Sequence, residues 1–191
     1  METTRASLLL RVRDHRDARA WAEFDSIYRP LLHRFASRSG LGHADAEDVV
    51  QHCMAAIGKH IHSFDYDAKK GRFKGWLRTL VNNRVRNQWR KKREQIGETK
   101  DFQLAQECEP EAEEVFDRLW MQEHLKHCLQ QLRAEMQPAT VAVYERYVLQ
   151  EREAEEICKE FDLTRDQLYR IKWRVTQKLS DMMRVLLDGE E

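Results

Sequence analysis

Hydrophobic residues recur at helical spacing through most of the chain, and this pattern predicts an all-α protein. Residues 21–35 carry apolar side chains at intervals of three and four, which is typical of a helix with one broad buried face: Trp21, Phe24, Ile27, Tyr28, Leu31, Leu32 and Phe35. Residues 39–42 interrupt the pattern, and an apolar stripe resumes over residues 49–61. We expect Asp45 to cap this second helix.

A third amphipathic stretch, residues 73–93, reads FKGWLRTLVNNRVRNQWRKKR and follows a polar loop at residues 63–72. Its predicted buried side consists of Phe73, Trp76, Leu77, Leu80, Val81 and Val85. Asparagine costs up to about 0.7 kcal/mol relative to alanine in a helix. Three asparagines among the arginines of the polar side therefore suggest that this face does more than contact water.

The rest of the chain divides into an aperiodic segment and a second helical region. Residues 94–110 lack periodicity and are rich in acids, which is typical of a flexible linker. Periodicity resumes near Val115 and should end before Pro138, which is expected in the first turn of the next helix. The pattern predicts a first domain at residues 1–93, an acidic linker at 94–114, and a second domain at 115–191.

The second domain contains the pattern of a helix-turn-helix. The segment REAEEICKEF predicts a short amphipathic helix, DLT a tight connection, and the residues from Thr164 onward a long helix. Thr164 and Gln167 have the spacing of a capping box, in which each side chain satisfies a backbone amide at a helix start.

Composition supports the all-α class and sets limits on function. The 191 residues are 41% hydrophobic and 35% charged, with 7 Gly and 3 Pro, so the turn-forming residues that a strand-rich fold needs are scarce. No apolar run approaches the roughly 20 residues that span a bilayer, and the N-terminal apolar core is too short for a signal peptide. A cytoplasmic protein is expected. The four cysteines are scattered, which favours reduced thiols over a disulfide framework.

Charge is segregated along the chain although its formal net value is zero, with 33 basic and 33 acidic residues. Residues 59–93 contain twelve Lys or Arg and two Asp, and residues 94–117 contain nine acids and one Lys. Such a basic block beside an acidic segment creates a field that can steer an anionic partner.

Two of the predicted helices are candidates for nucleic-acid contact. In a helix-turn-helix, the second helix enters the major groove, where arginine can bind guanine and glutamine can bind adenine bidentately. Its exposed positions here are Arg165, Asp166, Gln167, Tyr169, Arg170, Lys172, Trp173 and Arg174. For residues 69–93 we expect a surface for phosphates and unpaired bases. A merely solvated helix would explain the cations but would leave Asn83 and Asn87 without a role.

Metal, cofactor and catalytic sites are not expected. Histidines and cysteines approach one another in sequence at His52 and Cys53, at His60 and His62, and at His124, His127 and Cys128, but no four-ligand spacing is complete. There is no phosphate loop, nucleophile elbow or coherent acid/base pair. Nothing in the sequence argues for an enzyme acting alone.

The order of these segments resembles a known family. AWAEFDSIYRPLLHRFA, DAEDVVQ, FKGWLRTLVNNRVRNQWRKKR, an acidic linker and EAEEICKEFDLTRDQLYRIKWRVTQKL are similar, over residues 15–187, to bacterial RNA polymerase sigma factors of the extracytoplasmic-function (ECF) group. The resemblance implies two small helical domains, regions 2 and 4, that bind core RNA polymerase and promoter DNA. Asp162 stands where the family often has glycine, so this aspartate is expected to adopt a left-handed conformation.

The resemblance also implies roles for individual residues. The implied polymerase-binding residues are Asp45, Asp48, Val49 and Gln51. The implied contacts to the melted −10 strand are Asn83 and Asn87, with phosphate contacts from Arg84, Arg86, Arg90, Lys91, Lys92 and Arg93. The implied contacts to the −35 duplex are Arg165, Gln167, Tyr169, Arg170 and Arg174. Whether an anti-sigma factor is a further partner stays open.

Two other functions remain as alternatives. A stand-alone helix-turn-helix regulator would need only the second domain and would leave the first unexplained. A protein-interaction scaffold would have no salt-dependent affinity for DNA.

Overall fold

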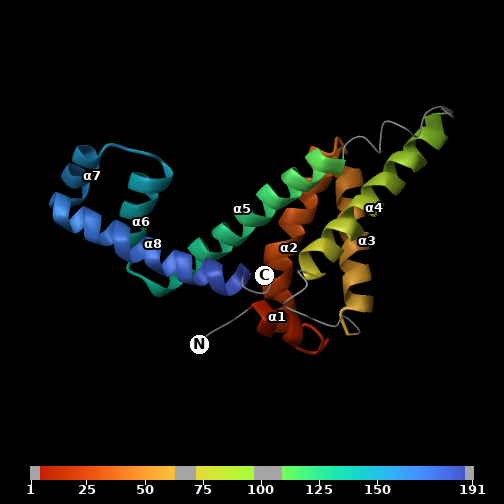
Figure 1. Ribbon diagram of the computed structural model, residues 1–191, viewed down its shortest axis with the longest axis horizontal. Coiled ribbons are helices and arrows are strands. Elements are labelled where there is room, and N and C mark those ends of the chain that lie inside the picture. Colours follow the sequence, from red (N-terminus) through yellow and green to blue (C-terminus); the bar gives the residue numbers. More distant parts are fainter. Residues whose placement is uncertain (1–4, 63–71, 97–108, 188–191) are drawn as a thin grey trace. The chain divides into compact units, whose positions relative to one another are not determined.

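The computed structural model describes residues 5–62, 72–96 and 109–187. Within these ranges all regular secondary structure is helical, which confirms the predicted all-α class (Figure 1). The helices are α1 (Arg5–Arg11), α2 (Ala18–Arg38), α3 (His43–His60), α4 (Arg72–Ile96), α5 (Glu109–Glu135), α6 (Pro138–Tyr144), α7 (Ala154–Phe161) and α8 (Arg165–Leu187). The chain divides into two compact units, one extending to His124 and the other comprising Leu125–Val185.

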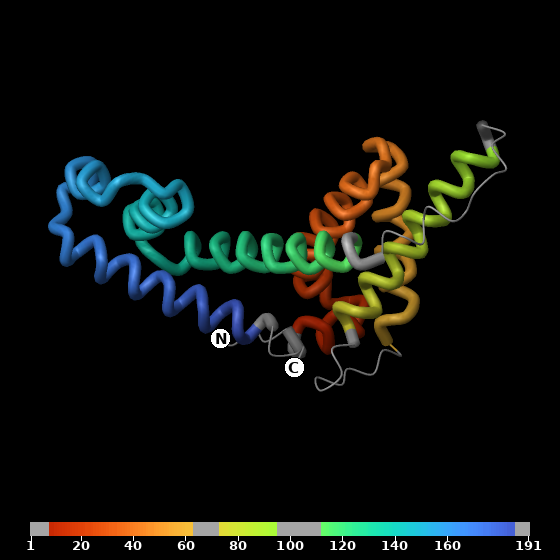
Figure 2. The backbone as a smooth tube through the Cα atoms, turned by 45° about the horizontal axis from the view of Figure 1, so that its top comes forward, coloured from red at the N-terminus to blue at the C-terminus, as the bar shows by residue number. Residues whose placement is uncertain are grey.

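In the first unit, α2, α3 and α4 lie side by side around a core of aliphatic and aromatic side chains (Figures 1 and 2). The stripe predicted on α2 is buried from Phe24 to Phe35, and Trp21 packs against the same core. Asp17 caps α2 by accepting a 2.9 Å hydrogen bond from the amide of Ala20. The Arg11 guanidinium also binds this carboxylate and holds its pKa below the usual value.

The start of α3 differs from the sequence-based expectation. Gly42, in an extended conformation, precedes the first helical residue, His43, and Asp45 lies inside the first turn. The prediction that Asp45 caps the helix is therefore wrong. Its side chain instead contacts α4. The carboxylate accepts a hydrogen bond from Gln88 and forms an ion pair with Lys92, and both of these residues lie on α4.

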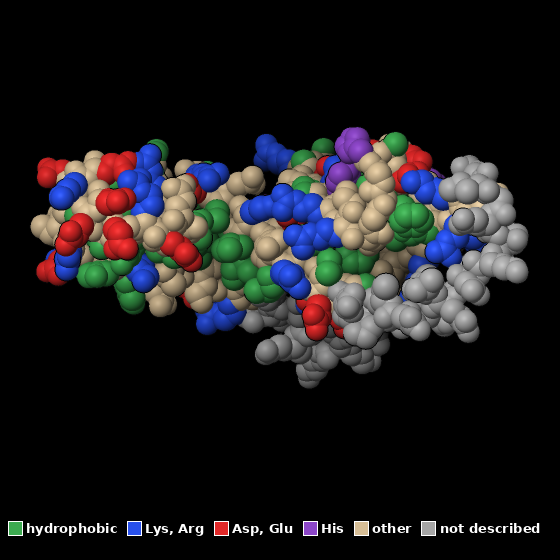
Figure 3. Space-filling view, turned by 90° about the horizontal axis from the view of Figure 1, so that it is seen from above, with side chains coloured by type: hydrophobic (Ala, Val, Ile, Leu, Met, Phe, Trp, Pro, Cys, Tyr) green, Lys and Arg blue, Asp and Glu red, His purple; other side chains and the backbone are tan. Residues whose placement is uncertain are grey.

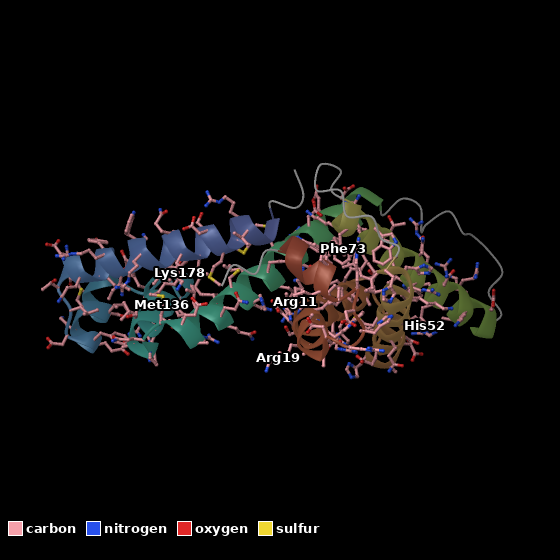
Figure 4. The ribbon with its side chains drawn as sticks, turned by 90° about the horizontal axis from the view of Figure 1, so that it is seen from below. Arg11, Arg19, His52, Phe73, Met136 and Lys178 are labelled. Carbon is pink, nitrogen blue, oxygen red and sulfur yellow. The ribbon has the colours of Figure 1, made fainter. Side chains whose placement is uncertain are left out.

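The first unit also includes the beginning of α5. Phe116, Leu119 and Trp120 are fully buried in its core, with the Phe116 and Trp120 rings 5.5 Å and 5.6 Å from those of Phe35 and Tyr28, respectively. Phe73 of α4 joins this aromatic cluster (Figure 4). The compact units thus do not coincide with the predicted domain boundaries, which remain a prediction. Part of the predicted linker at 94–114 lies outside the described residues. In the described part, α4 continues to Ile96 and α5 begins at Glu109.

The second unit is built from the end of α5, α6 with a π-helical turn at Glu145–Leu149, α7 and α8. Pro138 occupies the start of α6, as predicted. Val143, Ile157 and Leu168 form a small core from three different helices. Lys178, in the middle of α8, forms an ion pair with Glu135 at the end of α5 at 2.6 Å (Figure 4).

No helix among the described residues is long and apolar enough to cross a membrane.

Candidate nucleic-acid interface

The basic helix α4 is fixed to its unit by one apolar side. Phe73, Leu77, Val81 and Val85 are buried, at spacings of four residues that keep them on one face of the helix. Trp76 and Leu80 pack at the edge of the same core. This confirms the predicted buried side and leaves the Asn- and Arg-bearing side toward solvent.

Beyond the core, the last turns of α4 are held by the connection between α2 and α3. The indole N–H of Trp89 donates a 3.1 Å hydrogen bond to the carbonyl of Ser39. Gly40 has a φ of +85°, a conformation that glycine adopts without steric cost, and its bare Cα faces the indole. The helix is therefore anchored close to its cluster of cations.

A polar contact reinforces this anchor. The Gln88 amide donates a 2.8 Å hydrogen bond to the Asp45 carboxylate, and Lys92 forms an ion pair with the same group. The Lys92 ammonium and the Gln88 amide lower the pKa of Asp45 below its usual value, because both favour the charged carboxylate. Two residues assigned to different partners by the resemblance, Asp45 and Lys92, thus contact each other.

The other predicted residues of α4 lie on its polar side at different depths. Asn83, Arg90 and Lys91 are exposed, whereas Arg84, Arg86, Asn87 and Arg93 are half-buried. Asn83 and Asn87 are one turn apart, and Arg90 follows after a further turn. This side offers amide groups beside guanidinium groups, the combination that can hold a phosphate while hydrogen bonding to a base edge.

The residues predicted to bind polymerase are divided between the surface and the interior of α3. Asp48 and Gln51 are exposed. Val49 is only 2% exposed and belongs to the core. Asp45, half-buried, contacts α4 as described above.

In the second unit, α7, a short turn and α8 form the predicted helix-turn-helix. Asp162 ends α7 with a φ of 52°, as expected for the left-handed position. The capping box is also present. The backbone N–H of Thr164 donates a 2.8 Å hydrogen bond to Gln167 Oε1, and the backbone N–H of Gln167 donates a 3.2 Å hydrogen bond to Thr164 Oγ1. Gln167, predicted as a DNA contact, therefore already uses its side-chain oxygen to start the helix.

The exposed side of α8 combines aromatic and charged groups. Tyr169 and Trp173 are 49% and 66% exposed, and together with Asp166 and Arg170 they line a shallow surface hollow. Arg174 is exposed one turn beyond Arg170. The charged side chains that surround this unit have both signs, as Figure 3 shows for the face in view.

Arg165 lies at the first position of α8 and reaches back to α7, where it pairs with Glu155 at 2.7 Å. The pair is largely exposed on both sides, so a phosphate could replace the carboxylate at little cost.

Several residues that shape these surfaces were not among the predicted sites. Gln88 and Trp89 anchor α4, but their partners lie more than forty residues away in sequence and no local pattern indicates them. The sequence pattern predicts Trp173 only as one of the exposed positions of the second helix. A signal was available for Trp173, since an indole on the polar side of an amphipathic helix is unusual.

Metal and thiol chemistry have no evident site in the described part of the chain. No group of three or more His, Cys, Asp or Glu side chains there is arranged to hold a metal ion. Cys53 and Cys128 are buried free thiols, and burial raises their pKa values to about 12 and about 11. Cys158 is a half-buried free thiol, and Cys108 lies outside the described residues.

Part of the chain is similar to known proteins. Residues 26–95 match the family model described as Sigma-70 region 2, a stretch that extends from the middle of α2 almost to the end of α4. The chain is also 30% identical over 111 residues to the ECF RNA polymerase sigma factor RpoE of Cereibacter sphaeroides. That match covers 58% of this chain and 59% of the relative. The first similarity is to a sigma-70 region and the second to an ECF sigma factor, and both agree with the resemblance that the sequence motifs indicated.

Proposed function

We propose that the protein is a transcription initiation factor, which directs core RNA polymerase to specific promoters. Its residues 26–95 match the family model of sigma-70 region 2. The observation that carries this proposal is the anchored basic helix of that region, with the exposed Asn83 and the half-buried Asn87 beside its cations. The protein itself would catalyse no reaction, since synthesis of RNA belongs to the polymerase.

The polymerase-binding surface is proposed on α3. Asp48 and Gln51 present polar groups on the outer side of this helix, and Val49 supports it from within. Asp45 would act indirectly, because its bonds to Gln88 and Lys92 fix the angle between α3 and α4. The docking helix and the DNA-binding helix would then move as one rigid body.

The polar side of α4 is proposed to hold the melted non-template strand of the −10 element. Arg84, Arg86, Arg90, Lys91, Lys92 and Arg93 would contact phosphates, while Asn83 and Asn87 would contact a base taken out of the stack. Hydrogen bonds to that base would offset the few kcal/mol that unstacking costs. A rigid helix favours this role because it loses little entropy when the strand binds.

The second unit is proposed to bind the −35 duplex through α8. Arg170 and Arg174 lie one turn apart on the exposed side and can reach guanine edges or phosphates. Tyr169 adds apolar surface, and Arg165 would exchange Glu155 for a DNA phosphate. Gln167 would contribute mainly by holding the N-terminus of α8 in place.

A run-off transcription assay tests the proposal. The purified chain, mixed with bacterial core polymerase and a library of promoter fragments, should initiate at a subset of them. Core polymerase alone provides the background. Failure of the mixture to exceed this background across the library would refute the proposed function.

The role of the asparagines has its own test. Asn83→Ala should weaken open-complex formation more than binding to closed duplex, because Asn83 would contact only the unpaired strand. Asn82→Ala is the matched control, since Asn82 is half-buried on the neighbouring face and has no proposed base contact. Equal losses of duplex binding and open-complex formation in Asn83→Ala would contradict the strand-holding role.

The second candidate function is a stand-alone helix-turn-helix regulator, favoured by the capped α8 with its exposed arginines. Such a protein would bind DNA without polymerase. A pull-down with tagged chain separates the two functions: an initiation factor should retain core polymerase, and a stand-alone regulator should not.

A further inference from the structure

The N-terminal half of α4 carries two more cations, Lys74 and Arg78. They belong to the stretch 69–93 that is expected to meet phosphates, but neither has an individual role among the predicted contacts. They share a row of positions four residues apart: Lys74, Arg78, Asn82, Arg86 and Arg90. In an α-helix each such step turns by about 40° around the axis. These five positions therefore follow one continuous path around the helix, from Lys74 to the exposed, asparagine-bearing side.

The first two cations of this row already have carboxylate partners on α5. Lys74 Nζ lies 3.2 Å from Asp117 Oδ1, and Arg78 forms an ion pair with Glu113. Glu113 and Asp117 are one turn apart, so their Cα atoms are about 6 Å apart along the helix axis. Two negative groups at this spacing, each facing a cation, resemble the charges along a nucleic-acid strand.

Packing holds these two acids in position. Phe116 and Trp120, on the same side of α5, are fully buried, and the Lys74 ammonium lies 6.0 Å from the centre of the Trp120 ring. A third ion pair, between Arg34 and the buried Glu123 at 2.7 Å, fixes the next turns of α5. The helix therefore stays in place, even if Glu113 and Asp117 release their partners.

The ion pairs at Lys74 and Arg78 are themselves weak. The side chains of Glu113 and Asp117 are about half exposed and those of Lys74 and Arg78 about a quarter exposed, so water reaches both pairs, and such pairs contribute little. A nucleic-acid strand brings many phosphates and releases counterions when it binds. Such a polyanion could displace the two carboxylates while the apolar side of α5 remains packed.

We propose that Lys74 and Arg78 form a phosphate-binding site for single-stranded nucleic acid, and that Glu113 and Asp117 occupy it in the free chain as substitutes for phosphates. The site would continue the cation row that the proposed −10 contact uses, and to that extent it rests on the proposed function. Its consequence is that the free protein binds nucleic acid less tightly than its cation row alone would allow.

The test uses the full-length chain without polymerase and a fluorescent oligothymidylate as the probe. Glu113→Gln should raise affinity by about two- to fivefold, the effect of removing one weak competing pair. The dependence of log affinity on log salt should steepen by about 0.7, as one more phosphate contact forms. Glu114→Gln is the matched control: it removes the same charge from the adjacent, exposed position of α5.

Two further variants keep the test specific. Asp117→Asn should also raise affinity, by freeing Lys74. Adding Arg78→Gln to Glu113→Gln should abolish the gain, because the freed guanidinium is then absent. Urea midpoints of the variants check that α5 remains packed.

Equal gains in Glu113→Gln and Glu114→Gln would overturn the proposal, because they would reflect net charge alone. Persistence of the gain after Arg78→Gln would overturn it too. Failure of run-off transcription would refute the proposed function and leave this comparison of variants unaffected.

Discussion

The indole ring of Trp89 packs against Gly40. A Cβ atom built on this glycine would lie 3.2 Å from Trp89 Cζ2, and the φ of +85° is already unfavourable for any residue with a side chain. The contact joins the connection between α2 and α3 to the part of α4 that carries the cations.

Gly40→Ala should therefore destabilise the protein by about 1–2 kcal/mol through backbone strain, with an added cost if Trp89 moves. Gly42→Ala is the control, because Gly42 has a φ of −68° and its nearest neighbouring atom would be 4.0 Å from the new Cβ. Urea unfolding of both variants measures the difference. Equal destabilisation would mean that the contact with Trp89 and the backbone conformation do not matter.

The bonds of Asp45 to Lys92 and Gln88 predict a dependence of stability on pH. The pKa of Asp45 is lowered in the folded chain from an ordinary value of 3.8, so the stabilisation is complete above that value and is lost as pH falls through the lowered pKa. Asp45→Asn should lower Tm at about pH 7, and the difference from wild type should shrink toward about pH 3. Asp48→Asn, on the exposed side of α3, should change Tm little at either pH. A difference for Asp45→Asn that is constant with pH would exclude the ionised carboxylate as its cause.

Burial of Trp120 predicts that the start of α5 stabilises the first unit. Trp120→Ala should lower the free energy of unfolding by about 3–5 kcal/mol, the usual cost of removing a large buried side chain. Met121→Ala, at the next position and 46% exposed, should stay within about 0.5 kcal/mol of wild type. A chain ending at Ile96 should likewise unfold at lower urea than one ending at Lys126. Equal midpoints for these two chains would contradict the assignment of α5 to the first unit.

The capping box separates the roles of two residues on α8. Gln167→Ala should lower stability by about 1 kcal/mol, because the Thr164 amide loses its acceptor. Arg170→Ala should leave stability unchanged and weaken binding to a cognate −35 duplex by about 1–3 kcal/mol. Unfolding curves and duplex titrations of both variants check this. Loss of stability in Arg170→Ala would show that this arginine has a structural role.

Local pattern determined much of the molecule. The apolar stripes of α2 and α4, the start of α6 at Pro138 and the capping box at Thr164 all follow from neighbours within a few turns, and each is present in the structure. The motif order also led to the resemblance to ECF sigma factors, and the similarities found over part of the chain agree with it. The roles of the individual site residues remain predictions.

Contacts between distant residues were decided only by the tertiary structure. The sequence places Glu113 in a linker at 94–114, because that stretch is rich in acids and lacks periodicity, and places Asp117 in the second domain. Both acids contact cations more than thirty residues earlier. Phe116 and Trp120 carry a helical pattern but no sign of which core they join. The same holds for Asp45, a plausible cap whose carboxylate is bound by α4 instead. Helical periodicity identifies which side of a helix is buried, whereas the packing of whole helices against one another determines which residues it meets.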